Sequence, residues 1–154
     1  MAAETVELVC DEYGAGPPIV VLHGLFGAAR NWQSVARELA STHRVIAVDL
    51  RNHGRSPHTD AMDYDVMAAD VQRLLAERDL HEVTLLGHSM GGKTAMTAAL
   101  QDASRIARLI VVDITPVPSP DIHTVMIDAM LAVPLDEVRR RSEVDALIRH
   151  AVPE

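Results

Sequence analysis

The sequence has one cysteine, few basic residues and no long apolar run, and each shortage excludes a class of protein. Cys10 has no second cysteine to pair with, so an internal disulfide is excluded and a reducing, cytoplasmic compartment is expected. Apolar runs such as residues 17–22 and 109–112 are far shorter than the roughly 20 residues that span a bilayer. The first ten residues contain Glu4 and Glu7 but no Lys or Arg, so they lack the basic start of a secretory signal.

Acidic residues outnumber basic ones by 22 to 14, which gives a formal net charge of −8. Because this excess repels phosphate groups, neither a nucleic acid nor an anionic membrane surface is expected as the main partner. The 154 residues, 48% of them apolar, suffice for the core of one packed domain. Composition therefore predicts a globular protein and leaves its chemistry open.

Short apolar segments alternate with helical patterns along the first three quarters of the chain. Strands buried on both faces are predicted at residues 19–22, 44–50, 83–86 and 108–114, and a weaker strand pattern covers residues 5–10. Helices are predicted at residues 31–40, with Trp32, Val35, Ala36 and Leu39 inward, at 63–78, with Asp63 as N-cap and Met67, Val71, Leu74 and Leu75 inward, and at 93–100. This order predicts an α/β fold with a mainly parallel sheet and flanking helices.

The pattern changes after the proline-rich residues 115–120. Apolar residues recur at helical spacing within residues 122–130 and again within 144–151, with no strand pattern between them. We therefore predict a core in residues 1–115 and the beginning of a helical cap or lid in residues 116–154.

The stretch from Gly87 to Thr94 carries the chemistry, and it matches two motifs at once. As G-x-S-x-G, with Ser89 between Gly87 and Gly91, it is typical of a nucleophile elbow between a strand and a helix. Such a turn is strained and exposes the serine hydroxyl above the sheet. The amide of Met90 would then point from the helix N-terminus toward a developing oxyanion.

The same residues match the phosphate-binding pattern G-x-x-x-x-G-K-[ST], which predicts a P-loop nucleotide-binding protein instead. The apolar segment that ends at Asp113 resembles the strand whose aspartate holds magnesium in such proteins. Both motifs require a strand, a turn and a helix, so the local context does not separate them.

Three observations favour the hydrolase interpretation. Residues 23–27, His-Gly-Leu-Phe-Gly, follow an earlier buried strand, where the amide of Leu25 can form the second half of an oxyanion hole. A P-loop commonly follows the first strand of its domain, whereas three predicted strands precede Gly87. Only one helix separates Lys93 from Asp113, which is a short interval for a P-loop protein.

Three segments together resemble the α/β-hydrolase family, in particular its bacterial esterases of the YbfF type. They are residues 19–27, 48–57 and 86–93, and the resemblance extends over most of residues 5–115. It implies cleavage of carboxylic ester or thioester bonds of small acyl substrates by a Ser–Asp–His triad, with no metal and no organic cofactor. It also implies Ser89 as the nucleophile and Asp113 as the triad acid.

The general base of the expected triad is not evident. In this family the histidine follows the acid, and only His123 and His150 follow Asp113, both in helical, cap-like sequence. We therefore expect the chain to be the N-terminal portion of a serine esterase, with an incomplete C-terminal half and impaired activity by itself. The strand at residues 109–112 would then be an exposed apolar edge through which the chain self-associates.

We expect the remaining polar residues that could carry chemistry to have structural roles instead. We interpret the loop containing Asp49, Arg51, His53, Arg55 and Ser56 as hydrogen-bonded to its own backbone rather than catalytic. His23 and His88 are expected to brace their turns, and Cys10 to pack in a strand.

Overall fold

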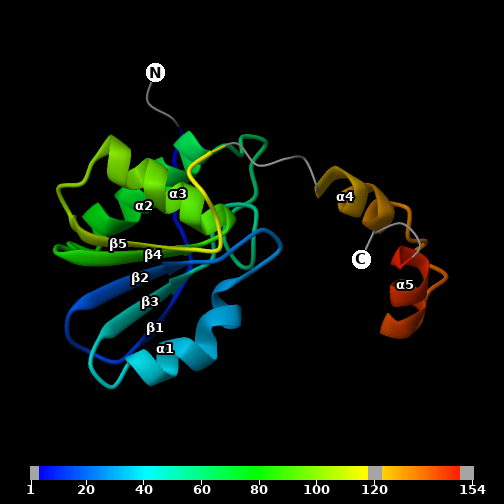
Figure 1. Ribbon diagram of the computed structural model, residues 1–154, viewed down its shortest axis with the longest axis horizontal. Helices are drawn as coiled ribbons and strands as arrows, with labels where there is room; N and C mark the ends of the chain where they lie inside the picture. Colours follow the sequence, from blue (N-terminus) through cyan, green and yellow to red (C-terminus); the bar gives the residue numbers. More distant parts are fainter. Residues whose placement is uncertain (1–3, 118–122, 150–154) are drawn as a thin grey trace. The chain divides into compact units, whose positions relative to one another are not determined.

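The computed structural model describes residues 4–117 and 123–149 and divides the chain into two compact units, Met1–Pro116 and Val117–Glu154. The first unit contains a five-stranded sheet in the order β1-β3-β2-β4-β5 (Figure 1). Its strands are β1 (Cys10–Tyr13), β2 (Pro18–Leu22), β3 (Arg44–Val48), β4 (Val83–His88) and β5 (Ile106–Val112). Only β1 is antiparallel to its neighbour, so the sheet is mainly parallel, as predicted.

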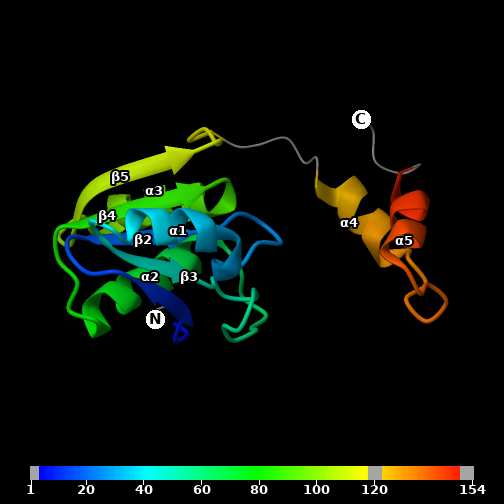
Figure 2. The same cartoon turned by 90° about the horizontal axis from the view of Figure 1, so that it is seen from below.

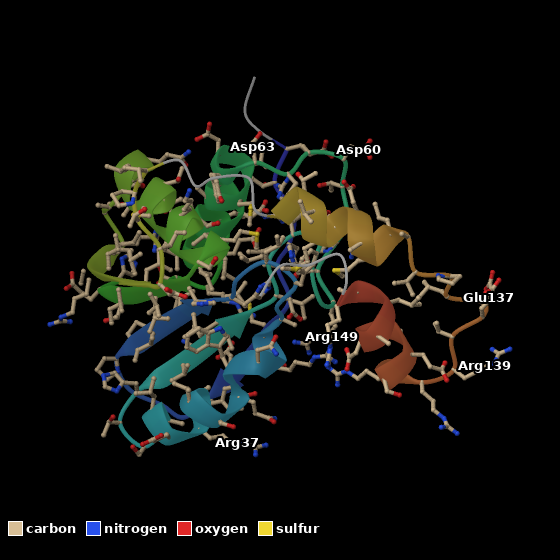
Figure 3. The ribbon with its side chains drawn as sticks, turned by 45° about the vertical axis from the view of Figure 1, so that its right-hand side comes forward. Arg37, Asp60, Asp63, Glu137, Arg139 and Arg149 are labelled. Carbon is tan, nitrogen blue, oxygen red and sulfur yellow. The ribbon has the colours of Figure 1, made fainter. Side chains whose placement is uncertain are left out.

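Helices cover both faces of this sheet (Figures 1 and 2). They are α1 (Gln33–Leu39), which follows a 3-10 turn at Ala29–Trp32, α2 (Tyr64–Glu77) and α3 (Met90–Gln101). Helix α1 lies on one face, and α2 and α3 lie together on the other. In Figure 3, Arg37 projects from α1 away from the sheet, and Asp63 lies at the start of α2. Among the described residues, no helix is long and apolar enough to cross a membrane.

Strand β2 is apolar at consecutive positions, rather than at every second position, because both of its faces are covered. Val20 and Leu22 belong to the core beneath α2 and α3, while Ile19 and Val21 belong to the core beneath α1. Successive side chains of a strand point to opposite faces, so a sheet covered on both sides buries every position.

Helix α2 confirms the expected cap and inner face. The Asp63 carboxylate accepts a hydrogen bond of 2.9 Å from the amide of Val66, which satisfies one of the free N–H groups at the helix start. The four predicted inward residues are all buried: Met67, Val71, Leu74 and Leu75.

Several boundaries and burials differ from the sequence prediction. The first strand begins at Cys10 rather than at residue 5. Val35, which the helical spacing predicts to face the core, is 44% exposed, whereas its neighbour Ala36 is buried. Strand β5 begins at Ile106 and pairs only with β4 among the described residues, so it is the exposed edge expected for residues 109–112 and not the strand buried on both faces that its apolar pattern predicts.

The second unit contains two helices, α4 (His123–Leu131) and α5 (Arg141–Ile148), which contact each other. Both agree with the predicted helical spacing, although α4 and α5 end at different residues from those expected. Within residues 123–149 of this unit, Val133 is the one buried apolar residue. The assignment of this unit to a cap stays a prediction, and residues 118–122 and 150–154 lie outside the described residues.

Candidate active site

Ser89 occupies a one-residue turn between β4 and α3. Its backbone angles are φ 51° and ψ −116°, a combination that residues with a side chain rarely adopt. Two backbone hydrogen bonds hold the turn: the Ser89 amide donates to the Val112 carbonyl over 3.0 Å, and the Ser89 carbonyl accepts from the Lys93 amide over 3.1 Å. The Ser89 hydroxyl makes no capping hydrogen bond to α3, so the residue does not serve as an ordinary helix-capping serine.

The glycines around Ser89 are required by close backbone approach. A Cβ atom on Gly87 would lie 2.2 Å from the carbonyl oxygen of Gly91. A Cβ atom on Gly91 would lie 2.5 Å from the carbonyl oxygens of Leu22 and His23. The G-x-S-x-G spacing therefore lets β2, β4 and the first turn of α3 pack against one another beneath the serine.

The loop after β2 lies beside this turn. A Cβ atom on Gly24 would be 3.3 Å from the Cβ atom of Ser89, so the backbone of Gly24 lies close to the Ser89 side chain. Met90 is the first residue of α3, and its amide belongs to the unpaired N–H groups of a helix start. Among the described residues, we find no acceptor for the amides of Leu25 and Met90. Both amides are therefore available to an oxyanion.

Asp113 follows β5 with φ 55°, and its side chain is 87% exposed. Its Oδ2 atom lies 3.9 Å from Nε2 of His88, the residue that precedes Ser89. His88 faces Asp113 with 41% of its side chain exposed, and its ring also lies against Gly24 in the loop after β2, so its role in bracing the turn stays a prediction. The side chain of His123 and the whole of His150 lie outside the described part of the chain, so the triad stays a prediction.

The P-loop interpretation is not supported. A P-loop needs several residues of loop around a phosphate, whereas here α3 begins at Met90, immediately after Ser89. The ammonium of Lys93 lies 5.9 Å from the centre of the Tyr64 ring, a cation–π distance. Among the described residues, no group of three or more His, Cys, Asp or Glu side chains could hold a metal ion.

The polar loop after β3 is hydrogen-bonded, as predicted. The Asp49 carboxylate accepts from the Ala29 amide over 2.7 Å and from Nε of Arg55 over 2.8 Å. Burial opposes ionisation of Asp49, but these hydrogen bonds outweigh it, so the pKa of Asp49 is below its ordinary value. The Ser56 hydroxyl donates to the Asp49 carbonyl and accepts from the Val9 amide. This network ties the loop to Val9, which precedes β1, and to the turn before α1.

Sequence reasoning missed Asp70, the buried partner of Arg51. Position 70 lies three residues after Met67 and four before Leu74, so a carboxylate on the apolar face of a helix was the available sign. Cys10 lies in β1 as expected, and burial raises the pKa of its thiol to about 11, which makes it unreactive.

A cavity of about 450 Å³ opens beside the serine turn. Its polar and backbone walls come from the loop after β2 and from His88, and its apolar walls come from Leu25, Phe26, Trp32 and Val35. The exposure of Val35 is therefore explained by its place in this cavity.

Residues 17–147 match the family model of the alpha/beta hydrolase fold. The chain belongs to the alpha/beta hydrolase family. Two curated proteins illustrate the similarity of this alpha/beta hydrolase chain to its relatives. The sn-1-specific diacylglycerol lipase ABHD11 of Xenopus laevis is 48% identical over 123 residues, which are 77% of this chain and 39% of that protein. Esterase YbfF of Escherichia coli (strain K12) is 38% identical over 141 residues, which are 89% of this chain and 54% of that protein.

A solved structure agrees with these relatives. A marine microorganism esterase has a TM-score of 0.87 and 37% sequence identity, over 97% of this chain and 60% of that chain. The alpha/beta hydrolase chain thus spans about half or less of the length of the two curated relatives.

Proposed function

We propose that this chain supplies the nucleophile and the oxyanion hole of a serine esterase or thioesterase. In the proposed reaction, Oγ of Ser89 attacks the acyl carbonyl while its proton passes to a histidine held by Asp113. The amides of Leu25 and Met90 donate hydrogen bonds to the oxyanion. The intermediate expels the alcohol or thiol, which takes the proton from the histidine, and water then releases the acid and regenerates the serine.

The backbone of Ser89 is the observation that carries this proposal. Residues held at such angles cost free energy, and they persist where the surrounding structure and function demand them. Here Gly87 and Gly91 allow the close packing that imposes the turn. The amides of Leu25 and Met90 lack acceptors among the described residues, which supports their proposed role in the oxyanion hole.

The cavity lined by His88 and the loop after β2 supports a substrate with an apolar part. Its apolar walls suit a short acyl or alcohol group, and its volume of about 450 Å³ lies within the range of small-molecule sites. The similarity to diacylglycerol lipases supports a second substrate class, the esters of glycerol. The same proposal assigns residues 116–154 to the beginning of a helical cap and includes a cytoplasmic location, drawn from the single Cys10.

Covalent labelling tests the nucleophile. A fluorophosphonate, whose fluoride is displaced by an activated serine Oγ, should add once to the chain, and peptide mass spectrometry should locate the adduct on Ser89. Ser89→Ala should abolish the adduct, whereas Ser34→Ala, at an exposed position in α1, should leave it unchanged. Adduct formation in the Ser89→Ala variant, or none in the wild type, would contradict the proposal.

The general base needs its own experiment. We expect it to be a histidine that follows Asp113, and the two in this sequence are His123 and His150. Loss of labelling in His123→Ala or His150→Ala, with His58→Ala unchanged, would identify the base within these 154 residues. If labelling is unchanged in both variants, neither His123 nor His150 is the general base. Hydrolysis of p-nitrophenyl acetate, p-nitrophenyl butyrate and a diacylglycerol by the wild-type chain, with Ser89→Ala as the control, would separate the two substrate classes.

A further inference from the structure

The loop that carries the Leu25 amide is held on both sides by histidine rings. His23 lies in the same loop and is 1% exposed, whereas His53 comes from the loop after β3 and is 9% exposed. The centres of the two rings are 5.0 Å apart. Neither histidine is a member of the proposed catalytic triad.

His23 holds the peptide group before Leu25. Its Nδ1 atom lies 2.8 Å from the Gly24 carbonyl oxygen, which also accepts from the Gly27 amide over 2.9 Å. In a trans peptide the C=O and N–H bonds point in opposite directions. Two donors on the Gly24 oxygen therefore direct the Leu25 N–H away from themselves.

His53 holds the peptide group after Leu25. The Phe26 amide donates to Nε2 of His53 over 3.3 Å, and Nδ1 of His53 lies 2.9 Å from the Arg51 carbonyl oxygen. Phe26 has φ 60°, a conformation in which a residue with a side chain needs outside support. The His53 contact, which spans 27 residues of sequence, supports this conformation together with the hydrogen bond from the Gly27 amide to the Gly24 carbonyl that closes the turn.

The partners of His53 determine its protonation state. A carbonyl oxygen only accepts and a backbone amide only donates, so Nδ1 carries the proton and Nε2 presents a lone pair. His23 has the same arrangement, since its Nε2 accepts from the Leu50 amide over 3.1 Å. Both rings are therefore neutral, and the acceptor at His53 Nε2 exists only in that state.

We propose that His53 is a positioning residue for the oxyanion hole, because its neutral Nε2 atom fixes the Leu25–Phe26 peptide and so the direction of the Leu25 amide. This role rests on the proposed function, in which the Leu25 amide binds the oxyanion. His53 does not touch the reacting atoms and acts through the loop alone. Misdirection of one oxyanion donor is a recognised cause of large rate losses.

Two substitutions separate the contacts of His53. In His53→Gln the side-chain oxygen reaches the position of Nε2 and can still accept from Phe26. In His53→Asn the shorter side chain can reach the Arg51 carbonyl but not the Phe26 amide. By hydrogen-exchange NMR on the full chain, we expect the Phe26 amide to exchange about tenfold faster in the Asn variant than in the Gln variant, because one hydrogen bond is lost.

The Ala29 amide, held by Asp49, is the internal control for general loosening. Equal exchange of Phe26 in the two folded variants would overturn the proposal. If the Asn variant does not fold, the imidazole nitrogen shifts of the wild type decide: a protonated Nε2 on His53 would overturn the proposal, and a protonated Nδ1 with a bare Nε2 would support it.

Fluorophosphonate labelling then measures the effect on the site. We expect labelling of Ser89 to be about tenfold slower in the Asn variant than in the Gln variant, at similar melting temperatures. Equal labelling rates in the two variants would exclude a positioning role. If the wild type is not labelled at all, the proposed function fails, while the exchange of Phe26 still decides whether His53 holds the loop.

Discussion

Arg51 and Asp70 form a bidentate ion pair in which both side chains are 1% exposed. Nε of Arg51 lies 2.6 Å from Oδ2 of Asp70, and Nη2 lies 2.8 Å from Oδ1. The guanidinium also donates to the carbonyls of Ala61 and Glu4. One buried pair therefore connects the loop after β3, the N-terminal segment and α2.

Removing one partner of this pair should be costly. In Asp70→Ala the Arg51 charge stays buried without its counter-ion, so we expect the free energy of unfolding to fall by about 3–5 kcal/mol. The matched control is Arg44→Ala, which breaks the exposed pair between Arg44 and Glu12 and should cost less than about 1 kcal/mol. Urea unfolding of both variants measures the difference, and equal losses would contradict the prediction.

Two glycines of the site should differ in their tolerance of alanine. A Cβ atom on Gly91 would meet backbone oxygens at 2.5 Å, which move only if strands shift, so Gly91→Ala should lose about 3 kcal/mol or more. A Cβ atom on Gly24 would first meet the half-exposed ring of His88, at 2.9 Å, which can rotate away. We expect Gly24→Ala to fold with a melting temperature closer to that of the wild type. The reverse order of melting temperatures would refute this account of the packing.

The stability of the chain should decrease on mild acidification because of His23. Burial lowers the pKa of His23 below its ordinary value of 6.5, and its hydrogen bond to Gly24 only partly opposes this. The unfolded chain therefore binds a proton at a higher pH than the folded chain, so stability is fully present above pH 6.5 and is lost as the pH falls through the lowered pKa. The pKa of Asp49 is also lowered, from an ordinary value of 3.8, so Asp49 changes the stability of the chain only at a more acidic pH than His23 does.

Urea midpoints at pH 7.5 and pH 5.5 test this assignment. We expect a lower midpoint at pH 5.5 in the wild type and a smaller difference in His23→Gln. His58→Gln, at an exposed histidine, serves as the control. An unchanged pH dependence in the His23 variant would show that another group is responsible.

Strand β5 should mediate self-association. It is the last strand of the sheet in Figure 1, and Leu109, Ile110 and Val112 are all exposed. If two copies pair antiparallel with Arg108 opposite Asp113, Leu109 lies opposite Val112, so the edge is complementary to itself in charge and in apolar character. We expect sedimentation equilibrium to show concentration-dependent association that Ile110→Lys reduces.

Leu100→Lys is the matched control, because Leu100 is an exposed leucine of α3 outside the edge. A monomer at every concentration, or equal effects of the two lysine substitutions, would refute the prediction.

Local chemistry made much of the fold predictable. Asp63 caps α2 because a carboxylate one residue before a helix can accept a free amide, and this depends on residues 63–66 alone. Ile19, Val20 and Val21 indicate a strand covered on both faces because no position is left for a polar residue. The glycine spacing around Ser89 indicated the turn, and the backbone angles found there agree with that expectation.

Contacts between distant segments decided the rest. The strand order decided the exposure of β5, because residues as apolar as those of a buried strand lie uncovered at the edge of the sheet. Arg51 pairs with Asp70, which is 19 residues away in the sequence, and His53 accepts a hydrogen bond from Phe26, which is 27 residues away. No local sequence pattern predicts these contacts, because they form only when the segments pack together.

By itself, the sequence determined most of the strands and helices and the position of the serine turn, because those properties depend on side-chain periodicity and on backbone sterics within a few residues. Only the tertiary structure decided which buried groups neutralise one another and which ring supports the Leu25 amide. Hydrogen bonds and ion pairs of that kind depend on distances of about 3 Å between groups that the chain brings together only when the sheet and its helices have packed.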